Sequence, residues 1–246
     1  MTEAILLAGF DERQRNNAYP PGIGQHYWLL SRNRIIYDKL RAIRAAAPMI
    51  DLGCGPGATV AFLRQRGIDC RGVDLATYQP VSAGLAGAIL YGTDAFERPT
   101  IERDGIRTVL LLDVLEHLRE PESFIRRCRE AYANAGHLVI TLPARAELWS
   151  NYDEFYGHQR RYDLTSAAAL CMDGGLEVIE AGYFFHALYP LLAVHRLMAV
   201  QRRVEFQPVR HHRLHALIAR GLHLEERWLP GTWPGTSLMV LARVRP

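Results

Sequence analysis

Lysine is almost missing from this sequence, and cysteines and long apolar runs are scarce. Lys39 is the only lysine among 246 residues. No run of 18 apolar residues occurs, so we expect no transmembrane helix. The N-terminus lacks the basic start and the small-residue cleavage site of a secretory signal. The four cysteines lie far apart with no C-x-x-C pair, which argues against a zinc knuckle and predicts free thiols in a reducing cytoplasm: Cys54, Cys70, Cys128 and Cys171.

Glycine triplets, heptads and low-complexity tracts are also absent, which excludes collagen-like and coiled-coil chains. Hydrophobic residues make up 49% and charged residues 22%, as in a globular protein with a real core. The net charge of +3 is unevenly spread, because residues 186–246 hold nine arginines and three glutamates. This basic segment suggests an anionic partner or a membrane surface, and the alternative is a solvated helix face.

Apolar strand-like runs alternate with helical patterns between residues 49 and 185, which predicts a parallel sheet with helices on both faces. A helix is expected over 26–47, two more over 186–228 with a break near Pro208, and a last strand at the C-terminus. The length fits one domain. We divide it into an N-terminal cap (1–48), a ligand-binding core (49–185), a helical insertion (186–236) and a final strand (237–246).

The run from Asp51 to Gly57, DLGCGPG, is the strongest local signal. A strand that enters a glycine loop and then a helix brings backbone N–H groups and a helix N-terminus beside a ligand. The G-x-G-x-G spacing differs from the dinucleotide G-x-G-x-x-G pattern, and no G-K-[ST] follows, which excludes an NTPase phosphate loop. Asp74 ends the next strand, where a carboxylate can accept both hydroxyls of a ribose. The alternative is that Asp74 only caps a helix.

Five motifs in order make this chain resemble the class I S-adenosylmethionine-dependent methyltransferases of the small-molecule branch. They are DLGCGPG at 51–57, VD at 73–74, TDAF at 93–96, DVLEHL at 113–118 and ITLPA at 140–144. HYWLLSRNR at 26–34 and GHQRRYD at 157–163 have analogues in the same branch. The resemblance implies an α/β fold with a Rossmann-like, doubly wound, seven-stranded sheet. That sheet would be mostly parallel with its last strand antiparallel, beside a helical cap and a helical insertion.

The resemblance also implies a cofactor, S-adenosylmethionine, with S-adenosylhomocysteine as product. Asp51 would orient the amino group, Asp74 would hold the ribose, and Asp94 would accept from the adenine amino group. Leu112 and Asp113 would line the methionyl end, and Leu75 is our candidate for stacking on adenine. The complete predicted set for the cofactor is Asp51, Gly53, Cys54, Gly55, Gly57, Asp74, Leu75, Asp94, Ala95, Leu112 and Asp113.

Methyl transfer from a sulfonium is an in-line displacement that needs alignment and exclusion of water, with a base only for a hydroxyl or protonated amine. His158 and His117 are the candidate bases, although His117 would alternatively hold its turn by a hydrogen bond. Arginine forks bind acid groups, so an acidic acceptor is predicted. One of two adjacent arginines is instead expected to pair with a nearby acid and rigidify the loop. Candidate acceptor-binding residues are Tyr27, Trp28, Arg32, Arg160, Arg161 and Tyr162.

One further hypothesis places a divalent cation among Asp113, Glu116, His117 and His158. This set is similar to that of small-RNA 2′-O-methyltransferases, in which an E-x-x-E-H motif and a later histidine hold a metal. Asp113 is shorter than the first glutamate of that motif. The alternative is that Glu116 and His117 bond backbone groups and only shape the pocket.

The leading prediction is thus a cytoplasmic methyltransferase that acts on O or N of a small, acidic molecule. Two alternatives are a lipid-linked acceptor at a membrane surface and an inactive cofactor-binding partner protein. We expect no nucleic-acid partner, because DVLEHL stands where base N-methyltransferases carry an NPPY-type motif. The glycine spacing disfavours a nucleotide-dependent oxidoreductase. The pattern does not predict an oligomeric state.

Overall fold

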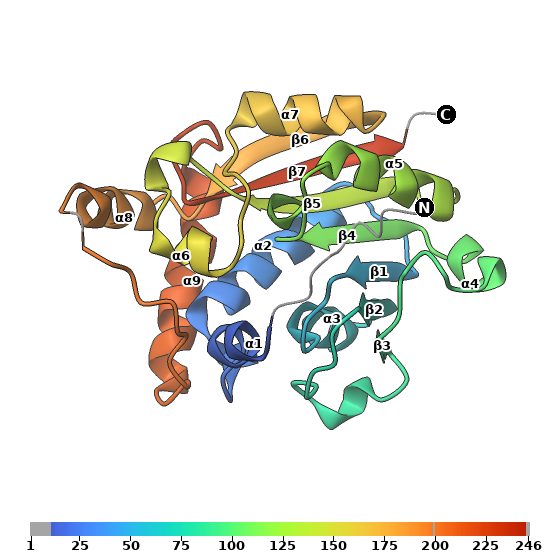
Figure 1. Ribbon diagram of the computed structural model, residues 1–246, viewed down its shortest axis with the longest axis horizontal. Coiled ribbons are helices and arrows are strands. Elements are labelled where there is room, and N and C mark those ends of the chain that lie inside the picture. The colour runs from blue at the N-terminus through green and yellow to red at the C-terminus, as the bar shows by residue number, and fades with distance from the viewer. Residues whose placement is uncertain (1–10, 199, 245–246) are drawn as a thin grey trace.

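A seven-stranded sheet forms the centre of the computed structural model, which describes residues 11–198 and 200–244 (Figure 1). The strand order is β3-β2-β1-β4-β5-β7-β6. Strand β7 runs antiparallel to both of its neighbours, while the other pairs are parallel, as predicted. The strands are β1 (Met49–Leu52), β2 (Cys70–Asp74), β3 (Ile89–Tyr91), β4 (Thr108–Leu112), β5 (His137–Pro143), β6 (Leu176–Phe184) and β7 (Ser237–Val244).

Helices cover both faces of this sheet because its central strands are apolar on both sides. On β4, Val109 and Leu111 join one buried cluster, while Leu110 and Leu112 join another. The first cluster takes in α5 and α7, and the second takes in α2, α3 and α9. The helices are α1 (Glu12–Ala18), α2 (Tyr27–Ala42), α3 (Ala58–Arg64), α4 (Thr100–Asp104), α5 (Pro121–Ala131), α6 (Asn151–Phe155), α7 (Leu164–Asp173), α8 (Leu188–Leu197) and α9 (His212–Trp228).

The strand order reverses between β1 and β4, which fixes where a ligand can bind. The chain leaves β1 toward β2 on one side and leaves β4 toward β5 on the other. Neighbouring connections therefore diverge at the carboxyl ends of these two strands and leave a crevice there. The loop that begins at Gly53 and the turn that begins at Asp113 both open onto this crevice.

The N-terminal cap and the insertion before β7 meet on one side of the sheet, where α2 packs along α9 (Figure 1). The cap holds α1, which the sequence pattern did not predict, and a short 3₁₀ turn at Ile23–Gln25. Residues 1–10 of the predicted cap lie outside the described residues. The two helices predicted over 186–228 are α8 and α9, joined by residues 198–211. No helix among the described residues is both long and apolar enough to cross a membrane.

Strand β7 begins beside a tight backbone contact at Gly235. A Cβ built on Gly235 would lie 2.3 Å from the carbonyl oxygen of Phe184 and 2.9 Å from its carbonyl carbon. Because both atoms belong to the backbone at the end of β6, they cannot swing aside as a side chain can. Glycine at this position thus sets how closely the two strands approach at the end that faces the crevice.

Two glycine substitutions with opposite expected signs test this packing. Gly235→Ala should lower the free energy of unfolding by about 3 kcal/mol, since overpacking against backbone is relieved only by moving a strand. Gly221→Ala is the matched control, because Gly221 lies in α9 and a Cβ added there would meet no neighbouring atom within 4 Å. It should raise the free energy of unfolding by about 0.5–1 kcal/mol. Chemical denaturation measures both, and equal effects would contradict the assignment.

Candidate functional site

The glycine loop leaves β1 in a left-handed conformation that its three glycines permit. Gly53, Gly55 and Gly57 have φ angles of 75°, 53° and 81°. A Cβ on Gly55 would lie 2.9 Å from the Tyr19 ring, and a Cβ on Gly57 would meet Ile89 at 2.1 Å. The second and third glycines are therefore required by protein packing, whereas Gly53 lines the cavity described below.

Asp74, at the end of β2, holds this loop in place. One of its carboxylate oxygens accepts the Gly55 N–H and the other accepts the Ala76 N–H, both at 2.8 Å. Burial raises the pKa of Asp74, and the two backbone donors oppose that rise. Each carboxylate oxygen can accept a further hydrogen bond. Loop support and ribose binding by the same carboxylate are thus compatible.

A small hollow of about 100 Å³ lies beside Asp74 and is lined by six of the predicted cofactor residues, Gly53 and Asp113 among them. Asp94 accepts the N–H of Phe96 at 2.8 Å and has Arg127 at 3.4 Å from its other oxygen. Leu75 is 40% exposed, which leaves its side chain available for a flat ligand. The structure brings together Asp74, Leu75, Asp94 and Ala95 here.

A larger cavity of about 570 Å³ adjoins this hollow and shares four lining residues with it. Its lining includes Asp51, Gly53, Cys54, Leu112 and Asp113 from the predicted cofactor set. The residues common to both spaces are Tyr19, Gly53, Asp113 and His117. An elongated ligand can therefore extend from the hollow into the cavity along the carboxyl ends of β1 and β4.

Asp113 stands at the junction of the two spaces, and two side chains hold its carboxylate. Its φ angle of 58° is in the left-handed region, where aspartate and asparagine are more common than other residues apart from glycine. Arg32 of α2 forms an ion pair with one carboxylate oxygen, and Thr141 of β5 donates to the other at 3.0 Å. Arg32 also donates to Thr59 at 3.1 Å, and its guanidinium lies 4.9 Å from the Trp28 ring. Arg32 was predicted to bind acceptor, but this structure commits its charge to Asp113.

Asp51 carries an unsatisfied oxygen on the cavity wall. The residue is 2% exposed, and its Oδ1 atom has no hydrogen-bond partner within the described structure. Burial raises the pKa of Asp51 to about 7; Arg32 opposes this rise, while Asp74 and Asp113 add to it. A buried polar atom without a partner is costly. This oxygen is therefore a ready acceptor for a cationic N–H group of a ligand.

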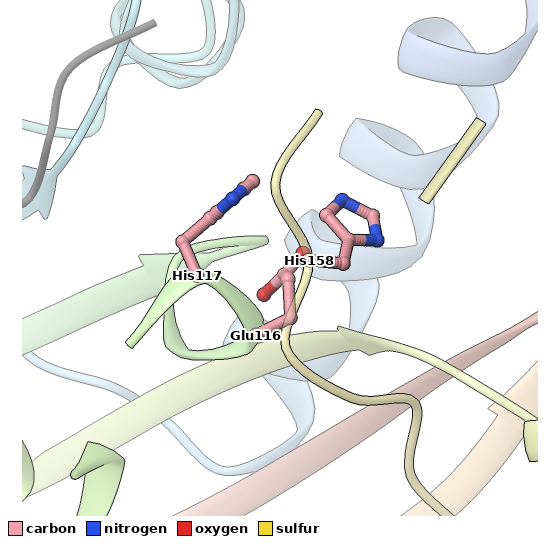
Figure 2. A group of neighbouring side chains, drawn as sticks. All are labelled: Glu116, His117 and His158. Carbon is pink, nitrogen blue, oxygen red and sulfur yellow. The ribbon is translucent and has the colours of Figure 1, made fainter. Parts of the chain in front are cut away.

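The side chains of Glu116, His117 and His158 lie close together (Figure 2), and all three residues line the large cavity. One ligand atom from each lies within 4.8 Å of the others. Glu116 and His117 belong to the 3₁₀ turn after β4, while His158 follows α6. The Gln159 N–H donates to the Glu116 carbonyl at 2.7 Å and ties the two segments together. Asp113 of the hypothetical metal set is held elsewhere by Arg32 and Thr141, so three of the four residues gather.

The electrostatic states in this cluster follow from burial. Glu116 is 1% exposed, its Oε2 atom has no partner among the described residues, and burial raises its pKa. Burial, and then His158, lower the pKa of His117 to about 3, which keeps that imidazole neutral. The Asp153 carboxylate accepts a hydrogen bond from Nδ1 of His158 at 2.9 Å, and this leaves the other ring nitrogen of His158 on the side of the cluster.

Both arginines of the segment after α6 form hydrogen bonds within the protein. Arg161 donates to Asp153 at 2.8 and 3.1 Å and to the Ala144 carbonyl at 2.9 Å. The pKa of Asp153 falls to about 2, because bonds from His158 and Arg161 outweigh its burial. Arg160 donates to the Arg119 carbonyl at 2.9 Å. The expectation that one arginine is structural is thus met by Arg161.

Within the described part of the chain, Arg160 and Tyr162 are not among the residues that line the cavity. Tyr162 is 4% exposed and belongs to the hydrophobic core on the other side. Tyr27 and Trp28 do line the cavity, and Trp28 also packs 6.0 Å from Phe185. The predicted acceptor set is therefore divided. Tyr27, Trp28, Arg32 and Arg161 line the cavity, whereas Arg160 and Tyr162 lie away from it.

Comparison with known proteins agrees with this arrangement. A family model described as a methyltransferase domain matches residues 26–181, which is more than half of the chain. The chain belongs to this methyltransferase domain family. The ubiquinone biosynthesis O-methyltransferase of Yersinia enterocolitica is 25% identical over 130 residues, covering 50% of each chain. That of Cupriavidus pinatubonensis is 28% identical over 103 residues, covering 39% of this chain and 41% of the relative. The methyltransferase thus spans half or less of these curated relatives.

Solved structures share the fold. A Haemonchus contortus phosphoethanolamine N-methyltransferase 2, bound to phosphomonomethylethanolamine and S-adenosylhomocysteine, has a TM-score of 0.56 at 14% identity, with 96% of this chain and 61% of that chain covered. The Burkholderia thailandensis 1,6-didemethyltoxoflavin-N1-methyltransferase has a TM-score of 0.53 at 14% identity, with 88% and 79% covered. Both support the class I methyltransferase fold for this chain.

Two cavity residues of this methyltransferase escaped sequence reasoning. Tyr19 precedes the matched family region and lies against Gly55. Arg202 follows that region, in the segment that joins α8 to α9. The excess of arginine over residues 186–246 was visible in the sequence, but its pattern gave no sign that one of these charges would turn into the cavity.

Proposed function

We propose that this protein transfers a methyl group from S-adenosylmethionine to O or N of a small molecule. The observation that carries the proposal is the unsatisfied Asp51 oxygen in a cavity that continues into the Asp74 hollow. The cofactor offers an ammonium group for the first carboxylate and ribose hydroxyls for the second. Asp94 accepts from the adenine amino group, and Leu75 packs on the ring. The sulfonium end lies by Leu112 and Asp113.

The work of the chain in this reaction is alignment and exclusion of water. A sulfonium leaves as a neutral thioether, so no acid is needed. His158 is the better-placed base for a hydroxyl acceptor, because Asp153 orients its ring and leaves one nitrogen facing the cavity. His117, with a pKa of about 3, holds a proton poorly near neutral pH. It shapes the wall through its contact with His158, whose ring centroid lies 4.8 Å away.

Affinity for S-adenosylhomocysteine should rise with pH through the ionisation of Asp51. In the protein without ligand the pKa of Asp51 is about 7, and the ammonium group of a bound ligand favours the ionised carboxylate. Binding then releases a proton, so the association constant should increase by up to about tenfold per pH unit below pH 7 and flatten above pH 8. Calorimetry in buffers of different ionisation enthalpy measures both the affinity and the released proton.

Two controls make this test specific. Methylthioadenosine lacks the amino-acid moiety, so its affinity should change little over the same pH range. Asp51→Asn should remove the pH dependence for S-adenosylhomocysteine, while Asp104→Asn, at an exposed position, should keep it. Binding of S-adenosylhomocysteine that is independent of pH in the wild type would contradict the role of Asp51. Cofactor binding without turnover on any acceptor would favour the inactive-partner alternative.

The cluster of Glu116, His117 and His158 supports a second element of the proposal, a divalent cation at this point of the cavity. Its donors are a carboxylate with an unsatisfied oxygen and two imidazoles, a set that suits magnesium, manganese or zinc. When bound, such a cation lowers the pKa of an acceptor hydroxyl and replaces a protein base. With Asp113 committed to Arg32, three protein ligands would leave positions open for acceptor oxygens.

Manganese titration by calorimetry tests the cation site apart from activity. The wild type should bind one Mn²⁺, and Glu116→Gln, which preserves volume, should weaken binding at least about tenfold, since it removes the charged ligand. His195→Gln, in α8 outside the cavity lining, is the matched control and should bind as the wild type does. Unchanged Mn²⁺ affinity in Glu116→Gln, together with turnover that survives EDTA, would overturn the cation site and leave His158 as the base.

A lipid-linked acceptor is the alternative function, and α8 favours it. This helix has no buried residue, and four apolar side chains on it and at its end are 54–85% exposed. Leu188, Leu191 and Leu192 from the same helix line the cavity. Figure 1 shows α8 at the far end of the molecule, away from the sheet. The exposed apolar residues are Leu191, Val194, Leu197 and Met198.

Sedimentation with phospholipid vesicles distinguishes this alternative. If α8 enters a lipid surface, the protein should co-sediment with vesicles that contain anionic lipid, and Leu197→Asp should reduce the bound fraction several-fold because a charge replaces an apolar contact. Ile101→Asp is the matched control, since Ile101 is 82% exposed on α4. Equal sedimentation of both variants and the wild type would count against a lipid-facing α8.

A further inference from the structure

Four arginines line the large cavity, and the charge of three of them is either paired with a carboxylate or exposed to solvent. Arg32 pairs with Asp113, and Arg161 pairs with Asp153. Arg203 is exposed to solvent. Arg202 is half-buried, and its guanidinium has no hydrogen bond or ion pair within the part of the chain that the structure describes. It makes a cation–π contact with the Tyr152 ring, 4.6 Å from Cζ to the ring centroid.

The position of Arg202 is built by the backbone rather than left to a flexible loop. The Arg202 N–H donates to Oδ1 of Asn151 at 2.9 Å, and the Arg202 carbonyl accepts from Nδ2 of the same side chain at 2.9 Å. Asn151 begins α6, the helix that also carries Tyr152 and Asp153. A few residues along, the Tyr156 hydroxyl donates to the Val204 carbonyl at 2.6 Å. The guanidinium is thus presented to the cavity by a segment clamped onto α6.

Burial without an acidic partner makes this charge costly in the free protein. Burial, and then the nearby Arg161, lower the pKa of Arg202, while Tyr152 and Asp153 oppose the shift. Planar guanidinium groups bind carboxylate and phosphate oxygens in pairs, and such bonds are strongest where water is displaced. An anion that entered the cavity would therefore form an ion pair with the Arg202 guanidinium.

The Tyr152 ring also places this charge relative to the reacting end of the cavity. The His158 ring centroid lies 6.3 Å from the Tyr152 centroid, on which Arg202 stacks at 4.6 Å. The guanidinium carbon therefore lies no farther from the His158 ring centroid than these two distances together, so one small molecule can contact both. Trp28, Leu188 and Leu192 supply apolar lining for the same cavity.

We propose that Arg202 is the specificity-determining residue of the acceptor site and binds a carboxylate or phosphate group of an otherwise apolar acceptor. The anionic group lies at one end of the acceptor and the methyl-accepting O or N at the other, beside His158. This inference rests on the proposed methyl transfer, which it deepens by naming the charge of the acceptor. It assigns to Arg202 the acid recognition that sequence reasoning assigned to Arg160 and Arg161.

Binding of simple aromatic probes tests the proposal on protein saturated with S-adenosylhomocysteine. Benzoate and phenyl phosphate carry the two anionic groups, and benzamide is their neutral counterpart. For the wild type, at least one anion should bind about tenfold or more tightly than benzamide. Their relative affinities tell which anionic group the site takes. Arg202→Gln should abolish the preference, and Arg202→Lys should restore part of it.

Arg210→Gln is the matched control, because Arg210 is exposed on the same connecting segment, lies outside the cavity lining and loses the same charge. It should keep the preference for anions. A wild type that binds benzamide and both anions equally, or an Arg202→Gln variant that retains the preference, would overturn the proposal. Saturation with S-adenosylhomocysteine is measured first for every variant, so a failure of cofactor binding would count against methyl transfer and not against the role of Arg202.

Discussion

The ion pair between Arg32 and Asp113 organises the site. Asp113 directly follows the central strand β4 in a left-handed conformation, at the point where the strand order reverses, and borders both the hollow and the cavity. Arg32 belongs to the N-terminal helix that closes the crevice from outside the sheet. A single contact therefore joins the cap to the switch point of the sheet. The cofactor path, the Trp28 wall and the separation of Asp113 from the histidine cluster all depend on it.

This pair leaves the site short of positive charge. Asp51, Asp74 and Glu116 are each at most 9% exposed, and Arg32 is already matched by Asp113. Burial raises the pKa of all three acids, which shows how poorly the free protein compensates their charges. A ligand with an ammonium and a sulfonium supplies cations where the protein has placed acids. The proposed cofactor thus fits the electrostatics of the crevice as well as its shape.

The sequence predicted most of the fold because its signals are local and repeated. The apolar, strand-like runs between residues 49 and 185 do form parallel strands, β4 and β5 among them. Most of the residues predicted to bind the cofactor line the two adjoining spaces, because motifs after successive parallel strands meet at one edge of the sheet. Their detailed roles were less visible. Whether Gly57 faces a ligand or Ile89 depends on β3, which lies more than 30 residues further along the chain.

Sequence patterns are least informative where a charge is paired with a residue distant in the chain. Arg161 pairs with Asp153, eight residues away, as expected of one of the two adjacent arginines. Arg32 and Arg160 instead bond groups on other elements, Asp113 and the Arg119 carbonyl, which their sequence neighbourhood does not reveal. Arg202 shows the converse, since nothing in its neighbourhood along the chain marks it as unpaired. Pairing between elements distant in sequence is a property of packing, and no single-chain pattern of residue types records it.

The two ends of the cavity therefore differ in charge, and this difference has a consequence for orientation. Acids surround the cofactor end, from Asp51 to Glu116, while Arg202 stands unpaired beyond Tyr152. An acceptor with one anionic end is repelled from the carboxylates and attracted to the guanidinium, so a single orientation is favoured before any specific contact forms. That orientation directs its uncharged, nucleophilic end toward His158. With the proposed cofactor bound, the same separation of charge would keep an anionic group away from the sulfonium, and the methyl group would face the neutral atom that accepts it.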